Sequence, residues 1–180
     1  MTKLSYLEAL PKELQQKFKK ANVVISDIKI NPKTDAVPIE KIADRLNLIP
    51  SYTEDEYGEN TIHLSVLMSH ENERFAIAKA IANRIFNRKE ITTKLLEEVE
   101  NNEIFKNKIT EYQKLIERKI NWANNANARQ LLLPNKIFSI ALTHTKQTTI
   151  NKKQLIHKLA KQFQVTPFLI EQKLQIRNSQ

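Results

Sequence analysis

The scarcity of glycine constrains this chain more than any other feature of its sequence. Gly58 is the one glycine among 180 residues. Tight hairpin turns, glycine-rich phosphate loops and dinucleotide-binding turns need glycine wherever the backbone takes a positive φ or approaches a ligand closely. Helix must therefore dominate. The chain is 41% apolar and 27% charged, so it is expected to fold, with room for one domain and a small appendage.

Cysteine is missing altogether, which excludes disulfides, thiolate metal sites and a cysteine nucleophile. This fits a reducing compartment. The longest apolar runs fall far short of the roughly 18 residues of a membrane span. The first 20 residues also lack the apolar region of a signal peptide. We therefore expect a soluble, cytoplasmic protein with no membrane partner.

Positive charge is concentrated in the last third of the chain. Residues 121–180 hold 9 basic side chains and 1 acidic one, whereas residues 1–60 hold 9 and 10. Such a positive field suits an acidic partner, either a nucleic acid or a protein. A lysine-rich surface without a partner explains the same counts, so the charge alone does not choose between these interpretations.

Apolar residues recur at helical spacing along most of the chain. This pattern predicts helices near residues 4–18, 38–48, 71–86, 91–118, 137–142, 155–163 and 166–174. Pro11 is an expected interruption of the first segment, and Pro134 is an expected helix boundary. Residues 91–118 suit one long helix or two shorter ones, and Asn101-Asn102 is the expected break between the two. Residues 23–30 predict an extended stretch. Residues 49–52 and 61–67 predict an antiparallel hairpin whose loop is the acidic segment 54–59. The fold class is thus α+β, with several helices against a small antiparallel sheet.

Four of these stretches carry longer motifs, in a fixed order. They read PIEKIADRL at 38–46, RFAIAKAIANRIF at 74–86, NANARQLLLP at 125–134 and LAKQFQVT at 159–166. Together they resemble the ImmA/IrrE family of zinc metallopeptidases, whose active-site helix is usually written RFTIAHELGHxLL and whose later segment is written ANxFAAxLLMP. The resemblance implies a zincin-like fold. Residues 1–36 would form an N-terminal helix and extended segment, 37–145 the peptidase-like core, and 146–180 a basic helix-turn-helix-like pair packed on that core.

The chemical groups of the family are replaced at all four matching positions. In the HExxH motif two histidines one turn apart bind zinc, and the glutamate between them activates a water. Here Lys79 and Asn83 stand at the histidine positions, Ala80 at the glutamate, and Ala123 at the third ligand. A cation, two methyl groups and one amide do not make a zinc site. The resemblance therefore implies a degenerate catalytic site, without metal or cofactor.

No other segment of the sequence supplies an active site. His70-Glu71 begins like the metal signature, but Arg74 occupies the second histidine position. The remaining histidines have no companion histidine at helical spacing: His63, His144 and His157. We therefore expect no enzymatic activity, with a metallo-endopeptidase like the active family members as an alternative.

A scaffold that keeps its packing and loses its catalytic groups can still bind. Members of this family pair with helix-turn-helix repressors of phages and mobile elements. The resemblance therefore implies a regulatory module that binds such a repressor, with Lys79, Asn83 and Arg84 as candidate contacts. Lys79 would place a positive charge where the metal's charge had been; the plainer alternative is that its ammonium simply reaches water.

The alternative function is a DNA-binding regulator that uses its basic C-terminal helices. The candidate phosphate contacts are Lys152, Lys153, Lys158, Lys161, Lys173 and Arg177. Residues 166–170, at the start of the last helix, are mostly apolar. Base-reading polar side chains are expected at that place in a recognition helix. The sequence therefore favours non-specific contact over sequence-specific reading.

Overall fold

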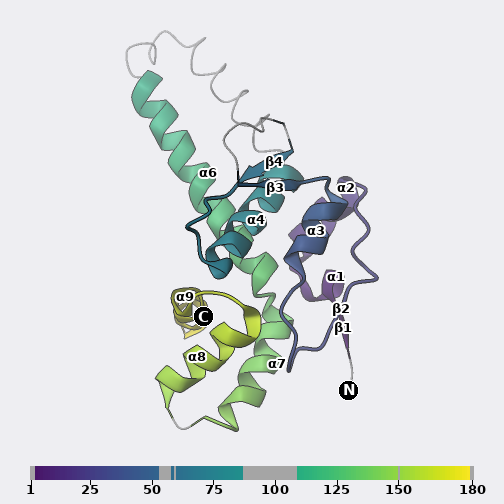
Figure 1. Cartoon of the computed structure of the whole chain (residues 1–180), viewed down its shortest axis with the longest axis vertical. Coiled ribbons are helices and arrows are strands. Elements are labelled where there is room, and N and C mark those ends of the chain that lie inside the picture. Colours follow the sequence, from purple (N-terminus) through teal and green to yellow (C-terminus); the bar gives the residue numbers. More distant parts are fainter. Residues whose placement is uncertain (1–2, 53–57, 59, 87–108, 150, 179–180) are drawn as a thin grey trace.

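The chain folds into a helical body with two very small sheets (Figure 1). The computed structural model describes residues 3–52, 58, 60–86, 109–149 and 151–178. The helices are α1 (Tyr6–Ala9), α2 (Lys12–Lys20), α3 (Ile39–Arg45), α4 (His70–Ile85), α6 (Ile109–Leu132), α7 (Asn135–Lys146), α8 (Lys152–Phe163) and α9 (Pro167–Asn178). The strands are β1 (Leu4–Ser5), β2 (Lys29–Ile30), β3 (Ile49–Ser51) and β4 (Thr61–His63). The α+β expectation, with helix dominant, is confirmed.

Local signals set the ends of the clearest helices. The Ser69 hydroxyl accepts a hydrogen bond from the Asn72 amide at the start of α4. The Asn151 side chain accepts one from the Gln154 amide at the start of α8. Both are N-caps that satisfy an amide left free by the first helical turn. Gln164 ends α8 with a positive φ of 53°, which turns the chain sharply into α9. The predicted pair of short C-terminal helices is therefore confirmed.

The strands differ from the predicted hairpin. β3 and β4 pair as expected, but they run parallel, with Ile49 opposite Thr61 and Ser51 opposite His63. The antiparallel hairpin at these residues was therefore wrong. The antiparallel pair of the fold is β1 with β2, where Leu4 lies opposite Ile30. The predicted acidic loop falls largely outside the described residues.

Two helical segments also differ from the sequence prediction. The N-terminal helix was expected from Leu4, but Leu4–Ser5 forms β1 and the first helix begins at Tyr6. The interruption expected at Pro11 is confirmed, since Pro11 separates α1 from α2. Proline interrupts the helix because it lacks the amide that the helix needs. In the segment predicted at 91–118, only the end is described, and there α6 continues unbroken to Leu132. The expected break at Asn101-Asn102 lies outside the described residues. Pro134 does separate α6 from α7.

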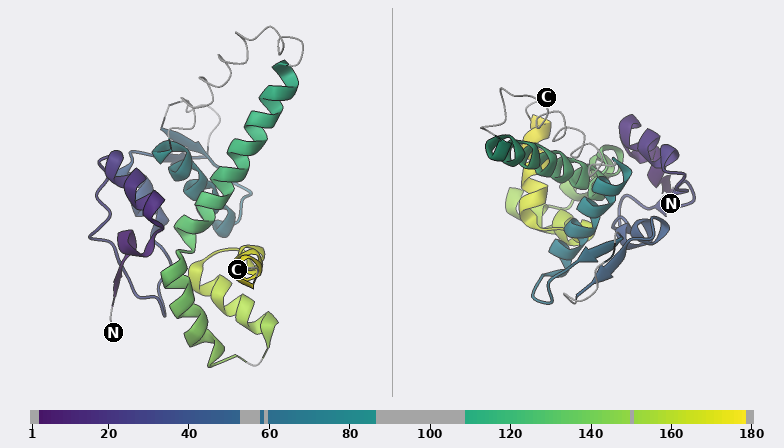
Figure 2. Two further views of the ribbon diagram at one scale, coloured as in Figure 1. Left: turned by 180° about the vertical axis from the view of Figure 1, so that it is seen from behind. Right: turned by 90° about the horizontal axis from the view of Figure 1, so that it is seen from above.

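One apolar core joins the N-terminal segment, the middle of the chain and the C-terminal helices. Its buried side chains run from Tyr6 to Ile170 in a single cluster. The Phe138 and Phe163 rings, on α7 and α8, lie 5.9 Å apart, and each fully buried aromatic side chain contributes about 1.5–3 kcal/mol. The buried Tyr6 hydroxyl donates to the Leu131 carbonyl oxygen over 2.9 Å. The C-terminal pair thus packs on the body, as both views in Figure 2 show. Among the described residues, no helix is long and apolar enough to cross a membrane.

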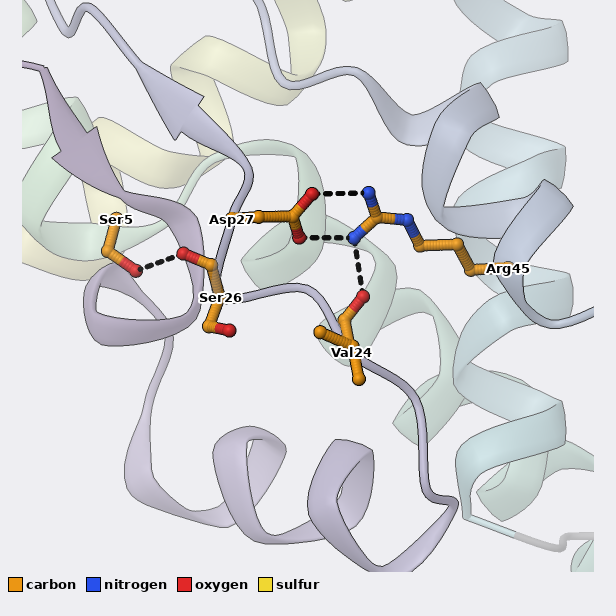
Figure 3. Close-up of polar contacts among 5 residues, drawn as sticks. All are labelled: Ser5, Val24, Ser26, Asp27 and Arg45. Carbon is orange, nitrogen blue, oxygen red and sulfur yellow. Dashed lines mark hydrogen bonds and ion pairs between the residues drawn. The ribbon is translucent and has the colours of Figure 1, made fainter.

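A polar contact fixes the end of α3 to the N-terminal segment (Figure 3). Arg45 donates to both carboxylate oxygens of Asp27, over 2.6 and 2.7 Å, and to the Val24 carbonyl oxygen. The Arg45 guanidinium lowers the pKa of Asp27 to about 2, because a bidentate arginine favours the ionised carboxylate. Both side chains reach solvent, so this pair positions the segment more than it stabilises the fold.

Candidate binding face on helix α4

The helix that carries the degenerate positions presents one face to solvent. Asn72, Ala76, Lys79 and Asn83 recur at three- and four-residue steps, and each is half-buried or exposed; we call them the α4 stripe. Residues at such steps lie on one side of a helix. The opposite side of α4 is buried in the core through Ile77, Ala78, Ile81, Ala82 and Ile85. Lys79 and Asn83 are therefore neighbours on the outer face.

The other two degenerate positions lie close to this face or on the neighbouring helix. Ala80 is half-buried beside the α4 stripe and packs against the core. Ala123 is half-buried on α6, which packs along α4. Arg84 is exposed near the end of α4. The four positions that the sequence motifs predict to correspond to a zinc site thus occupy two helices in mutual contact.

The side chains at these positions do not fit a zinc ion. Zinc in proteins takes imidazole nitrogen, thiolate or carboxylate oxygen. Lys79 offers an ammonium, Ala80 and Ala123 offer methyl groups, and Asn83 offers a single amide. Across the described ranges, no three histidine, aspartate or glutamate side chains lie close enough together to hold a metal ion. No reaction step is assigned to this face.

A buried arginine on α4 connects this helix to α3, and it was not predicted as part of the site. Arg74 is 3% exposed, and its Nη1 donates to Glu40 Oε1 on α3 over 2.6 Å. Its Nη2 donates to the Val37 carbonyl oxygen over 2.6 Å. The sequence does contain a sign of its burial: Arg74 lies three, four and seven residues before Ile77, Ala78 and Ile81, and so on the buried face of the helix. Arg74 is a positioning residue, because it ties the start of α4 to α3.

Exposed apolar side chains lie on the sheet and connector that precede α4. They are Ile49, Tyr52, Val66 and Leu67, exposed by 60, 50, 74 and 93%; we call them the apolar edge. Desolvation and the nearby carboxylate of Glu73, in the first turn of α4, raise the pKa of the Tyr52 hydroxyl. The Leu64 amide donates to the Ser51 carbonyl oxygen, so Tyr52 lies near the segment that carries Val66 and Leu67. Exposed apolar surface of this kind typically marks a place that binds another molecule.

The predicted nucleic-acid contacts separate into two groups. Lys152, Lys153, Lys158 and Lys161 are exposed on α8. Lys173 is not available at the surface: it is 7% exposed, and its ammonium donates to Gln130 Oε1 (3.2 Å) and Asn135 Oδ1 (2.5 Å). That residue was therefore wrongly assigned as a surface contact, because α9 turns this position toward α6 and α7. The Arg177 side chain lies outside the described residues.

Comparisons with known proteins found no relative of this chain. No protein-family model, no curated protein and no solved structure matches the chain. The ImmA/IrrE resemblance therefore stays a prediction from the four sequence motifs. The exposure of the α4 stripe and the burial of Lys173 are features of the chain itself and do not depend on it.

Proposed function

We propose that this protein is a catalytically inactive, ImmA/IrrE-like pseudo-metallopeptidase that binds a helix-turn-helix repressor of a phage or mobile element. The binding surface would be the α4 stripe together with the apolar edge. The observation that carries the proposal is that none of the three positions matched to zinc ligands carries a zinc-ligand type and the position matched to the catalytic glutamate is Ala80, while the other side of α4 is a well-packed core face. A loss of packing as well would have argued for a helix with no retained role.

Lys79 gives this surface a specific chemical preference. Its position on the α4 stripe is half-buried, so its aliphatic stem lies along the helix while its ammonium is available to a partner. In the active family a metal cation would stand at this place. A carboxylate of the bound repressor would pair with the Lys79 ammonium, and a charge pair of this kind contributes more to specificity than to affinity.

The apolar edge would supply most of the affinity. Leu67 is almost fully exposed, and Val66 and Ile49 are mostly exposed. Large apolar side chains that become buried at the centre of an interface are typical of binding hot spots. The partner would cover these side chains and reach across the first turns of α4 toward Lys79.

Binding to a purified repressor tests this proposal. The probe is the helix-turn-helix repressor encoded nearest to this chain's own gene, titrated calorimetrically. Leu67→Asp and Lys79→Glu should each weaken binding at least tenfold, because one buries a charge in an apolar contact and the other reverses a charge pair. Val24→Asp is the matched control, since Val24 is 67% exposed and lies on the segment beside Arg45, away from α4. Its affinity should equal that of the unmodified protein.

Two results would contradict the proposal. The first is no measurable binding of that repressor, or equal weakening by all three variants. The second is cleavage of the repressor in the presence of added zinc, which would favour the metallo-endopeptidase alternative. Cleavage is scored by mass spectrometry on the same mixtures.

A further inference from the structure

The exposed side of α8 carries a row of basic groups at regular spacing. Lys153, His157 and Lys161 follow at four-residue steps and are all exposed. Lys152 and Lys158 flank them, and we call these five residues the α8 basic stripe. Four residues of helix rise about 6 Å, so the row extends over about 12 Å. The opposite side of the helix is buried through Leu155, Ile156, Leu159, Ala160 and Phe163, which holds the row in a fixed orientation.

The sequence on both sides of this stripe carries no negative charge. No acidic residue stands in the sequence between Glu117 and Glu171, so α7, α8 and the loop between them contribute only basic and neutral side chains. α8 lies at the outer edge of the molecule in Figure 1 and in the left view of Figure 2. An open hollow of about 550 Å³ runs beside the stripe, lined by Asn151, Lys153, Gln154, His157 and Lys158. A large partner can therefore reach these groups.

We infer that the α8 basic stripe binds the phosphate backbone of duplex DNA, without reading its sequence. This inference is independent of the function proposed for α4. Fixed cations on a rigid helix suit the regular phosphates of a double helix. The exposed side of α8 carries no phenylalanine, tyrosine or tryptophan, whereas single-strand binding surfaces stack bases on such aromatic side chains. Lys158 is partly engaged already, since its Nζ donates to the Thr148 carbonyl oxygen over 2.8 Å.

The geometry of α9 explains why sequence reading is not part of this inference. In a helix-turn-helix, the second helix places polar side chains on base edges. At the start of α9, Phe168 is 63% exposed, while Leu169 and Ile170 are buried. The buried Lys173 points to the α6–α7 junction. The contacts would therefore come from α8, the first helix of the pair, and would be made to phosphates.

Fluorescence anisotropy with short labelled duplexes tests the inference. Two duplexes of unrelated sequence should bind equally. With about four lysines neutralising phosphates, the logarithm of affinity should fall against the logarithm of salt concentration with a slope of about −3 to −4. The triple variant Lys152→Gln, Lys153→Gln and Lys161→Gln should weaken binding at least about tenfold at moderate salt and reduce the slope by about three.

A second triple variant tests whether binding depends on the α8 basic stripe or only on the net charge of the protein. Lys12→Gln, Lys19→Gln and Lys20→Gln remove three exposed lysines from α2, and binding should match the unmodified protein. The inference is overturned if both triple variants weaken binding equally, if a single strand binds more tightly than the duplex, or if no duplex binds at low salt. Tighter binding to one of the two duplexes would also overturn it, because it would mean that bases are read.

Discussion

The contact between Arg74 and Glu40 gives a sharp prediction about how α4 is held. Arg74 is 3% exposed and donates to Glu40 Oε1 and to the Val37 carbonyl oxygen. Removing one partner of a buried ion pair costs 3–5 kcal/mol, because the other charge stays buried without compensation. The Glu40 side chain is 46% exposed, so water already screens part of the pair. We therefore expect Glu40→Ala to destabilise the protein by about 2–3 kcal/mol.

Arg74→Met should cost less than Glu40→Ala. It removes the buried charge and keeps most of the side-chain volume, while Glu40 returns to water. The Val37 carbonyl oxygen also keeps a partner, because it accepts from the Ile39 amide over 2.8 Å. We expect the free energy of unfolding to fall by about 1–2 kcal/mol, because the variant loses charge-assisted hydrogen bonds and water replaces part of them. In the double variant the loss should stay at about 1–2 kcal/mol, since Arg74→Met removes the charge that Glu40 compensated.

Urea unfolding followed by circular dichroism measures these free energies, provided that the dependence on urea is unchanged among variants. Lys41→Ala is the control, because Lys41 is exposed on α3 beside Glu40. It should change the free energy of unfolding by no more than about 0.5 kcal/mol. Additive losses in the double variant would refute the reasoning. So would a loss from Glu40→Ala smaller than that from Arg74→Met.

Further predictions concern other parts of the fold. Tyr6→Phe should cost about 1–2 kcal/mol in urea unfolding, because it leaves the buried Leu131 carbonyl oxygen without its hydroxyl donor; an unchanged midpoint would contradict that contact. Gln164→Gly should raise the free energy of unfolding by about 0.5–1 kcal/mol, since Gln164 has a positive φ, whereas His157→Gly in the middle of α8 should lower it by about 1 kcal/mol. The Asp27 pKa is lowered from 3.8 to about 2 in the folded protein, so its contribution to stability is present above about pH 4 and is lost as the pH falls toward 2. Asp27→Asn and Arg45→Met should each flatten the acid side of the stability curve, and a curve of unchanged steepness would show that the pair is not formed in solution.

Helix positions followed from the sequence where local signals and apolar spacing agreed. α3, α4, α8 and α9 each combine a regular buried face with a capping side chain or a proline at the first turn, and these signals act within a few residues. That Lys79 and Asn83 share one face of α4 followed in the same way, because their four-residue spacing places them on one side of a helix.

The direction of the β3–β4 pair did not follow from the sequence. Only residues 52–60 connect the two strands, and a parallel connection usually needs a dozen residues or more. Each strand has three residues, too few for a pattern of alternation to specify direction. Lys173 was misplaced for a related reason, since whether a lysine on a short amphipathic helix is buried depends on which distant amide groups, here Gln130 and Asn135, come to meet it.

Zinc binding before and after restoration of the four family residues tests the central claim most directly. The restored variant carries Lys79→His, Ala80→Glu, Asn83→His and Ala123→Glu, and circular dichroism checks that it is folded. In calorimetric titrations the unmodified protein should bind no stoichiometric zinc, and the restored variant should bind one zinc per chain. Tight binding of one zinc by the unmodified protein would contradict the account. A folded restored variant that binds none would also contradict it, because these four positions would then not form the site that the resemblance implies.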